Sequence, residues 1–179
     1  WGAELHLKDI DSELAKIMAK AGLRIVFVGI ESINPESIIK TKRQNAPTDK
    51  QLSSIKILEK NGISVKAMFI FGFPGDNLKN ALNTINYALS LPITYLQFSV
   101  FTPYPGTPIF SEYKDKITAK NYEEYTQWGL VFKHENLTNK DIKYLLNKSY
   151  KNFYSSINRL VRIFYRLTKI ELRKRFGLF

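Results

Sequence analysis

The sequence predicts an α/β fold in which about four parallel strands form the second half of a TIM-type barrel, followed by a helical extension. Apolar segments of strand length alternate with amphipathic segments long enough for crossover helices. Successive strands are spaced by roughly 30 to 40 residues, as in α/β barrels. Because four strands cannot close a barrel, residues 1–110 are assigned to the barrel half and residues 111–179 to the helical extension.

Each expected element has a local signature. Helix starts carry Asp, Asn or Thr, helix ends carry Gly or Pro, and strands are short runs of β-branched and aromatic residues. The expected strands lie within residues 1–7 and over residues 24–30, 63–71 and 94–101. The expected helices between them run from Asp11 or Ser12 to Gly22, from a capping box at 48–51 to Gly62, and over 78–91. A further helix start is expected at Asn34–Pro35. After Tyr113 the prediction is helical, with a long amphipathic segment from Thr138 almost to Phe176 and a break within it left open.

The segment from Met68 to Asn77 has the pattern of a strand–loop–helix ligand site. An apolar run ends on Gly72 and turns at once through Pro74 and Gly75. A glycine-rich turn lets a ligand approach the main chain closely, and the first turn of the next helix offers unpaired N–H groups to a polar or anionic group. The alternative is that these residues only make a turn.

Three strand ends carry candidate site residues. They are Glu31–Ser32, the segment 72–75 and the segment 101–104. Carboxyl ends of parallel strands share one edge of the sheet, where chemistry collects in α/β folds. Considered alone, Glu31 could instead be a solvated residue at a strand end. Tyr104 could likewise be a residue that only stiffens its loop. One shared rim accounts for all three.

Composition excludes several classes of site. Hydrophobic residues make up 44% and charged residues 24% of the chain, as in globular proteins. The chain has no cysteine, which excludes a disulfide, a thiolate zinc site or a Cys-ligated iron–sulfur cluster within it. His6 and His134 are too far apart to suggest a metal centre and are interpreted as structural or surface residues. No signal peptide is visible, so a cytoplasmic location is expected.

Charge is concentrated at the C-terminus. The chain has a net charge of +11, and residues 148–179 hold nine Lys or Arg residues against one acid. The body is therefore not expected to bind nucleic acid. In the tail, Arg159, Arg162, Arg166, Lys169 and Arg173 share one helical face, and Phe153, Ile157, Leu160, Phe164 and Leu167 share roughly the opposite one. Two interpretations stay open: a helix packed on the protein with a solvated basic side, or a peripheral helix on an anionic membrane surface.

The segments 28–34, 69–76 and 103–108 together resemble the radical S-adenosylmethionine (radical SAM) superfamily. Their order and spacing are most similar to its cobalamin-binding-domain branch. The resemblance covers residues 1–110 and implies that the strands are the third to sixth of a six-stranded partial barrel. The family motif Gly-x-Ile-x-Gly-x-x-Glu corresponds to residues 68–75, which keep Ile70 and Gly72 but have Met68 and Gly75 at its two ends.

By resemblance, Glu31 and Ser32 contact the ribose of S-adenosylmethionine, residues 68–75 line its adenine, and the segment from Gln97 to Phe101, with Tyr104, packs near the adenine and the substrate. The implied cofactor-binding residues are Glu31, Ser32, Ile70, Gly72, Phe73, Pro74, Phe101 and Tyr104. A carboxylate can accept hydrogen bonds from two ribose hydroxyls, and aromatic and glycine-rich surfaces accept a flat purine.

The chain departs from the family in lacking the Cys-x-x-x-Cys-x-x-Cys loop that holds its [4Fe–4S] cluster. That loop would precede Trp1, so we expect a fragment of a radical SAM iron–sulfur enzyme, active only with its N-terminal half. The fragment would bind S-adenosylmethionine and shape a small-molecule substrate pocket for 5′-deoxyadenosyl-radical chemistry. Resemblance to the cobalamin-binding-domain branch alone implies that the reaction could be a methyl transfer or a rearrangement with cobalamin. The alternative is a non-catalytic, cluster-less binding or membrane-surface module.

Overall fold

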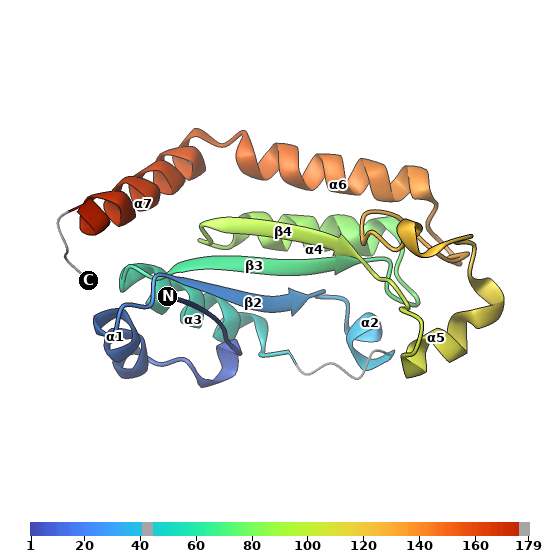
Figure 1. The fold of residues 1–179 in the computed structure, drawn as a ribbon, viewed down its shortest axis with the longest axis horizontal. Coiled ribbons are helices and arrows are strands. Elements are labelled where there is room, and N and C mark those ends of the chain that lie inside the picture. The colour runs from blue at the N-terminus through green and yellow to red at the C-terminus, as the bar shows by residue number, and fades with distance from the viewer. Residues whose placement is uncertain (41–44, 176–179) are drawn as a thin grey trace.

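The computed structural model describes residues 1–40 and 45–175 (Figure 1). The expected helix end near Phe176 and the side chain of Arg173 lie outside the described parts. The elements are β1 (Gly2–Glu4), η1 (Leu7–Asp9), α1 (Ser12–Lys20), β2 (Ile25–Glu31), α2 (Pro35–Lys40), α3 (Thr48–Lys60), β3 (Ser64–Phe71), α4 (Leu78–Ser90), β4 (Tyr95–Val100), α5 (Pro108–Tyr113), η2 (Lys114–Lys116), η3 (Tyr122–Glu124), α6 (Asn139–Tyr154) and α7 (Ile157–Arg175).

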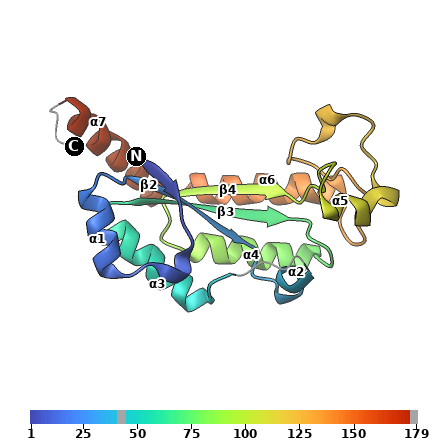
Figure 2. The same cartoon turned by 60° about the horizontal axis from the view of Figure 1, so that its bottom comes forward.

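The four strands form one parallel sheet in the order β1-β2-β3-β4, which confirms the predicted α/β fold. Helices α1, α3 and α4 cover one face of this sheet, and α6 runs along β4 (Figure 2). Among the described residues, no helix crosses the middle of the opposite face. The sheet therefore has a covered face and an open face, and α5 and α7 lie at its opposite ends (Figure 1).

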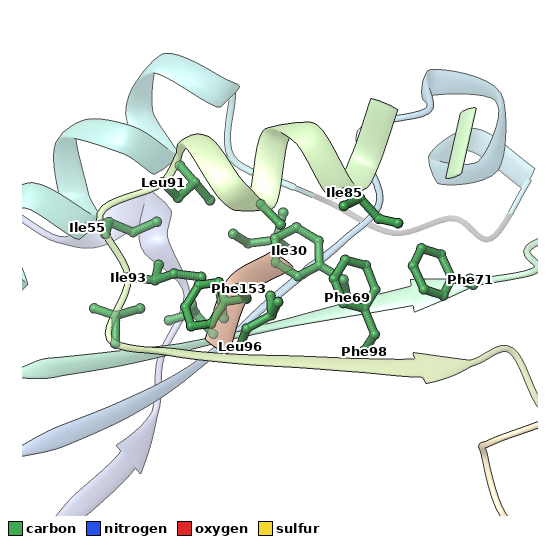
Figure 3. Close-up of a cluster of buried hydrophobic side chains, with 14 of the residues drawn as sticks. Ile30, Ile55, Phe69, Phe71, Ile85, Leu91, Ile93, Leu96, Phe98 and Phe153 are labelled. Atoms are coloured by element: carbon green, nitrogen blue, oxygen red, sulfur yellow. The ribbon is translucent and has the colours of Figure 1, made fainter. Parts of the chain in front are cut away.

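The core lies between the covered face and the helices (Figure 3). Every second strand residue points into it, because successive side chains of a strand face opposite sides of the sheet. Phe69, Phe71 and Phe98 are fully or almost fully buried, and the Phe98 ring stacks on both others with centroid distances of 5.0 Å to Phe69 and 4.3 Å to Phe71. Aliphatic side chains from α3 and α4, such as Ile55 and Ile85, complete the contact.

The free edge of β4 is closed by two tyrosines of α6. The Tyr154 hydroxyl accepts a hydrogen bond from the Leu96 amide (3.1 Å) and donates to the Leu96 carbonyl (3.0 Å). The Tyr150 hydroxyl does the same at Phe98, with distances of 3.0 and 3.1 Å. Burial raises the pKa of Tyr150, which keeps its phenol protonated and able to donate. The edge groups that would pair with a further strand are thus occupied by side chains.

Two local predictions were wrong. Thr48 does not cap α3: Pro47 is the N-cap residue and makes no side-chain cap bond. A capping box is instead formed at the start of α6 by Thr138 and Asp141. Residues 114–138 form no α-helix and contain only the short 3-10 helices η2 and η3. Residues near 117 and 132 pair with each other in an antiparallel manner. Ile117 forms an isolated bridge with Phe132, and Thr118 donates its amide to the Val131 carbonyl (2.8 Å).

The C-terminal segment is two helices, α6 and α7, and the orientation of α7 contradicts the predicted solvated basic side. Arg162 donates to the Pro92 carbonyl (2.7 Å), and Arg166 donates to the carbonyl (2.7 Å) and carboxylate (3.0 Å) of Glu59. Arg159 donates to the Leu89 carbonyl. These carbonyls lie in the last turns of α3 and α4 and in the loop after α4, so the arginines satisfy groups that helix ends leave unpaired. The apolar side of α7 faces away from the body. Among the described residues, no helix has the length and apolarity needed to cross a bilayer.

We predict that replacing Tyr150 or Tyr154 by Phe lowers the free energy of unfolding by about 1 to 3 kcal/mol, because two strand groups lose their partner. Urea denaturation measures this loss. Hydrogen exchange should also accelerate selectively at the Phe98 amide in Tyr150→Phe and at the Leu96 amide in Tyr154→Phe. Tyr144→Phe, on the same helix at a position 49% exposed, is the control. Unchanged exchange at both amides would contradict the edge role.

Candidate functional site

The open face of the sheet forms the floor of the candidate site. Its side chains align in rows across the strands, because the parallel register places Gly29 beside Met68 and Met68 beside Gln97. A hollow of about 480 Å³ lies on this face. It is lined by Ile25, Phe27, Lys66, Tyr95, Leu96, Gln97, Trp128, Tyr150 and Tyr154. The lining is mostly aromatic and apolar with few polar groups, as in small-molecule sites.

Glu31 stands at the carboxyl end of β2 in a backbone conformation that non-glycine residues rarely adopt. Its φ is 65°, and the register to β3 shifts between Gly29 and Glu31. A Cβ atom added to Gly29 would lie 2.6 Å from the Glu31 Oε1 atom. The carboxylate therefore folds back over Gly29, in space that only glycine leaves free. Strand alternation places Glu31 on the open face with Phe27 and Gly29, and the register shift marks a β-bulge there. Bulges and strained backbone gather at functional sites.

Ser32 is buried directly behind Glu31. Its hydroxyl accepts a hydrogen bond from the Asn34 amide (3.0 Å), and its own amide donates to the Ile30 carbonyl (2.8 Å). The Asn34 side chain in turn donates to Ser37 (2.8 Å) at the start of α2. Ser32 thus shapes the turn that carries Glu31.

The turn after β3 is closed by Asp76. This carboxylate is 2% exposed and accepts hydrogen bonds from the amides of Gly72 (3.2 Å) and Asn77 (3.1 Å). The Gly72 amide, which the sequence suggested as a ligand contact, is therefore bonded within the loop. Gly72 has a φ of 77°, and a Cβ atom there would lie 3.2 Å from Leu130. The positive φ favours glycine at this position, and Leu130 leaves little room for a larger residue.

His134 links the same turn to the segment before α6. Its Nδ1 atom accepts hydrogen bonds from the amides of Asn136 (3.0 Å) and Leu137 (3.1 Å), so the ring carries its proton on Nε2, 3.1 Å from the Phe73 carbonyl. His134 is a structural residue, as the sequence suggested. Phe73 is buried, and its neighbour Pro74 is partly exposed.

An aromatic cluster follows β4. The Phe101 ring packs against Phe73 (5.3 Å between centroids), Tyr113 (5.9 Å) and Phe132 (5.9 Å). Tyr104 lies further out in the loop, 36% exposed, and its hydroxyl accepts a hydrogen bond from the Gln127 side chain (2.8 Å). This loop therefore carries both a packed and an accessible aromatic residue.

The structure brings only part of the predicted set onto the open face. Glu31 and Ile70 lie there, whereas Ser32 and Phe73 are buried and support adjoining turns. None of the eight predicted cofactor-binding residues lines the hollow, which lies over the amino-terminal halves of β2, β3 and β4. Of its lining residues, the sequence prediction included only Gln97, and period-two alternation in β3 and β4 could have indicated Lys66 and Tyr95. No local pattern indicates Trp128, which comes from the segment wrongly predicted as helical.

The described residues contain no group of three or more His, Cys, Asp or Glu side chains able to hold a metal ion. The chain also has no cysteine, so it does not fit a Cys-ligated cluster by itself. The Glu31 carboxylate, which covers Gly29, and the apolar side chains beside it on the open face fit a polar, ribose-bearing cofactor with a flat base.

Sequence comparison identifies the family. The family model of the radical SAM superfamily matches residues 5–88. An uncharacterized methyltransferase of Pyrococcus horikoshii is 32% identical over 157 residues, which are 86% of this chain and 34% of that protein. The chain belongs to the radical SAM superfamily. Another relative, the bacteriochlorophyllide d C-12(1)-methyltransferase of Chlorobaculum tepidum, is 27% identical over 76% of this chain and 30% of its own length.

Solved radical SAM structures share the fold. The methyltransferase TsrM from Kitasatospora setae, with tryptophan and a SAM analogue bound, matches 86% of this chain and 35% of its own with a TM-score of 0.59 at 16% identity. Its structure with cobalamin and a [4Fe-4S] cluster covers 64% of this chain and 21% of its own, with a TM-score of 0.57 at 23% identity. This radical SAM chain spans about a third of the length of the curated relatives named above.

Because Glu31 has a left-handed backbone, we predict that Glu31→Gly is more stable than Glu31→Ala by about 1 kcal/mol. Both variants lose the carboxylate, so the difference isolates the backbone strain. Thermal or urea unfolding of the two proteins measures it. Equal stability would mean that residue 31 leaves this conformation once the carboxylate is gone.

Asp76 generates a prediction on pH. Burial raises the pKa of its carboxyl above the ordinary 3.8, although the amides of Gly72 and Asn77 and the nearby His134 oppose the shift. A carboxyl with a raised pKa binds its proton more tightly in the folded state, so its contribution to the free energy of unfolding falls as pH rises from 3.8 through the raised value.

We therefore expect the unfolding free energy of the wild type, relative to Asp76→Asn, to decrease as pH rises above 3.8. Urea titrations of both proteins across this range measure the difference. A difference that grows with pH would show that the amide hydrogen bonds outweigh burial. Asp76→Ala should lose about 2 kcal/mol because the buried Gly72 amide is left without an acceptor.

Proposed function

We propose that this chain is a part of a radical SAM enzyme that contains the C-terminal half of its barrel, and that its open face binds S-adenosylmethionine beside the substrate. The observation that carries the proposal is Glu31, held in a left-handed conformation and folded over Gly29 at the carboxyl end of β2. Strain of this kind persists only where surrounding structure enforces it. Here it places a carboxylate at the end of the sheet where α/β folds bind ligands.

The residues named for cofactor binding divide into two roles in this proposal. Glu31 accepts hydrogen bonds from the ribose hydroxyls, and Ile70 supplies apolar surface under the adenine. Tyr104 and Phe101 border the space for the substrate. Supporting roles fall to Ser32, which holds the turn behind Glu31, and to Gly72, Phe73 and Pro74, which form the loop closed by Asp76.

S-adenosylmethionine supplies the radical chemistry of this superfamily when it is bound with a reducing cluster. The chain's own contribution is orientation: a carboxylate at one side, a packed aromatic cluster at the other and an apolar floor between them. Such placement reduces the entropy that must be lost in the reaction. The cysteines for the cluster would come from residues outside this chain, which has none.

For the reaction class we infer methyl transfer assisted by cobalamin. Two relatives that align over 86% and 76% of the chain are named as methyltransferases, and the TsrM structure of the same fold contains cobalamin. The substrate would be a small molecule held beside Phe101 and Tyr104.

The competing proposal is a cluster-less binding module, favoured by the absence of cysteine from the chain. Sequencing the reading frame upstream of Trp1 distinguishes the enzyme from the binding module. A Cys-x-x-x-Cys-x-x-Cys there supports the enzyme, whereas a frame that begins near Trp1 supports the binding module.

We predict that Glu31→Ala weakens S-adenosylmethionine binding by about tenfold or more in the cluster-bearing enzyme, because charged hydrogen bonds to the ribose are lost. Gly29→Ala should act in the same direction, since its methyl group would displace the carboxylate. Equilibrium dialysis under anaerobic conditions measures affinity, and iron analysis should show unchanged cluster content. Glu123→Ala, at an exposed acid of η3, is the control. Equal affinity of Glu31→Ala and wild type would overturn the role of Glu31.

A further inference from the structure

The outer side of α7 is an apolar surface exposed to solvent. Ile157 is 75% exposed and Phe164 69% exposed, values usual for charged rather than apolar side chains. The exposed apolar residues of this outer face are Ile157, Leu160, Val161, Phe164, Leu167 and Leu172. Their spacing places them all on one side of the helix, so they form a stripe along it. Contiguous apolar surface of this kind marks an interaction site.

The body holds α7 in this orientation. Arg162 and Arg166 donate to backbone carbonyls at the ends of α3 and α4 and in the following loop, and Arg166 also pairs with Glu59 at 3.0 Å. The Arg166 and Glu59 side chains are 13% and 10% exposed, so the pair is sheltered from water and salt. The basic side of the helix thus anchors it, and the apolar side is presented outward.

A basic groove lies between α7 and the C-terminal ends of α1 and α3. It encloses about 1050 Å³ and contains eight basic residues against one acid, Glu59. The basic residues are Lys16, Lys20, Arg24, Lys56, Lys60, Arg162, Arg166 and Lys169. The one acid is already paired with Arg166, and none of the five lysines has a carboxylate partner among the described residues. The groove therefore has an unbalanced positive charge along the inner side of α7, across the helix from the apolar stripe.

We propose that α7 and this basic groove form an attachment site for an anionic lipid surface. Helices that lie in a membrane interface insert an apolar face at the boundary of headgroups and acyl chains and keep basic residues at headgroup level. Here the stripe supplies the apolar face. The lysines of the groove, which are all exposed, supply the contacts to anionic headgroups.

Charge decides between a lipid surface and a second copy of the chain. Pairing two α7 stripes would bring together two segments that each carry nine basic residues and one acid over residues 148–179. Like charges in apposition oppose such a dimer. An anionic bilayer complements this charge, and the apolar stripe gives it a second, salt-independent contact.

The test is co-sedimentation of the full chain with vesicles of phosphatidylcholine alone and of phosphatidylcholine with phosphatidylglycerol. We expect binding to the anionic vesicles, a decrease of severalfold at about 0.5 M salt, and weak binding to the neutral ones. Failure to bind anionic vesicles, or equal binding to both kinds, would overturn the proposal. Because no cofactor is involved, neither result bears on the proposed function.

Two variants separate the contacts. Leu160→Asn combined with Phe164→Asn should reduce the partition coefficient about tenfold or more, because two large apolar side chains no longer enter the interface. Ile39→Asn is the matched control, since Ile39 is 75% exposed on α2. Unchanged binding of the double variant would exclude α7 as the contact. Circular dichroism and the unfolding midpoint verify that the variants fold.

Lys56→Glu combined with Lys60→Glu should reduce binding to anionic vesicles about fivefold or more and leave weak binding to neutral vesicles unchanged. Lys140→Glu with Lys143→Glu, at the start of α6 near the opposite end of the molecule, makes the same charge change as a control (Figure 1). Equal losses in both pairs would mean that net charge rather than this groove controls binding. A dimer in light scattering that is lost in Leu160→Asn with Phe164→Asn would assign the stripe to a second copy instead.

Discussion

The closure of the β4 edge by Tyr150 and Tyr154 is the constraint on which the rest of the structure depends. A strand edge exposes a row of amides and carbonyls that would otherwise pair with another strand. Each tyrosine hydroxyl satisfies one amide and one carbonyl. The sheet therefore stops at β4, its second face stays open, and α6 is fixed along the edge, which determines where α7 begins.

The two faces of the sheet serve different purposes because strand side chains alternate. Phe69 and Phe98 stack in the core, while the neighbouring residues Met68 and Gln97 lie side by side on the open face. The stability of the sheet comes from the covered face and leaves the other free for ligands. Glu31, at the bulge that follows Gly29, adds a carboxylate at the end of this free face.

The C-terminal helix shows how hydrogen bonding can reverse an amphipathic pattern. Burying arginines is favourable here because helix ends present carbonyls that need donors, and planar guanidinium groups provide several donors each. Arg162 and Arg166 donate to such carbonyls in the loop after α4 and in the last turn of α3. The apolar side of α7 is left outside as a consequence of this anchoring.

The sequence alone determined the parallel α/β fold and the positions of the strands, because hydrophobic periodicity and helix-end residues are local signals. It also identified Glu31 and the Gly72 turn as strand ends. Only the tertiary structure decided that the Gly72 amide is bonded to Asp76 and that Trp128 joins the open face. The tertiary structure also decided the orientation of α7, through the hydrogen bonds of its arginines to the body. Each depends on partners distant in the chain, and no local pattern encodes which carbonyl or carboxylate a side chain will meet.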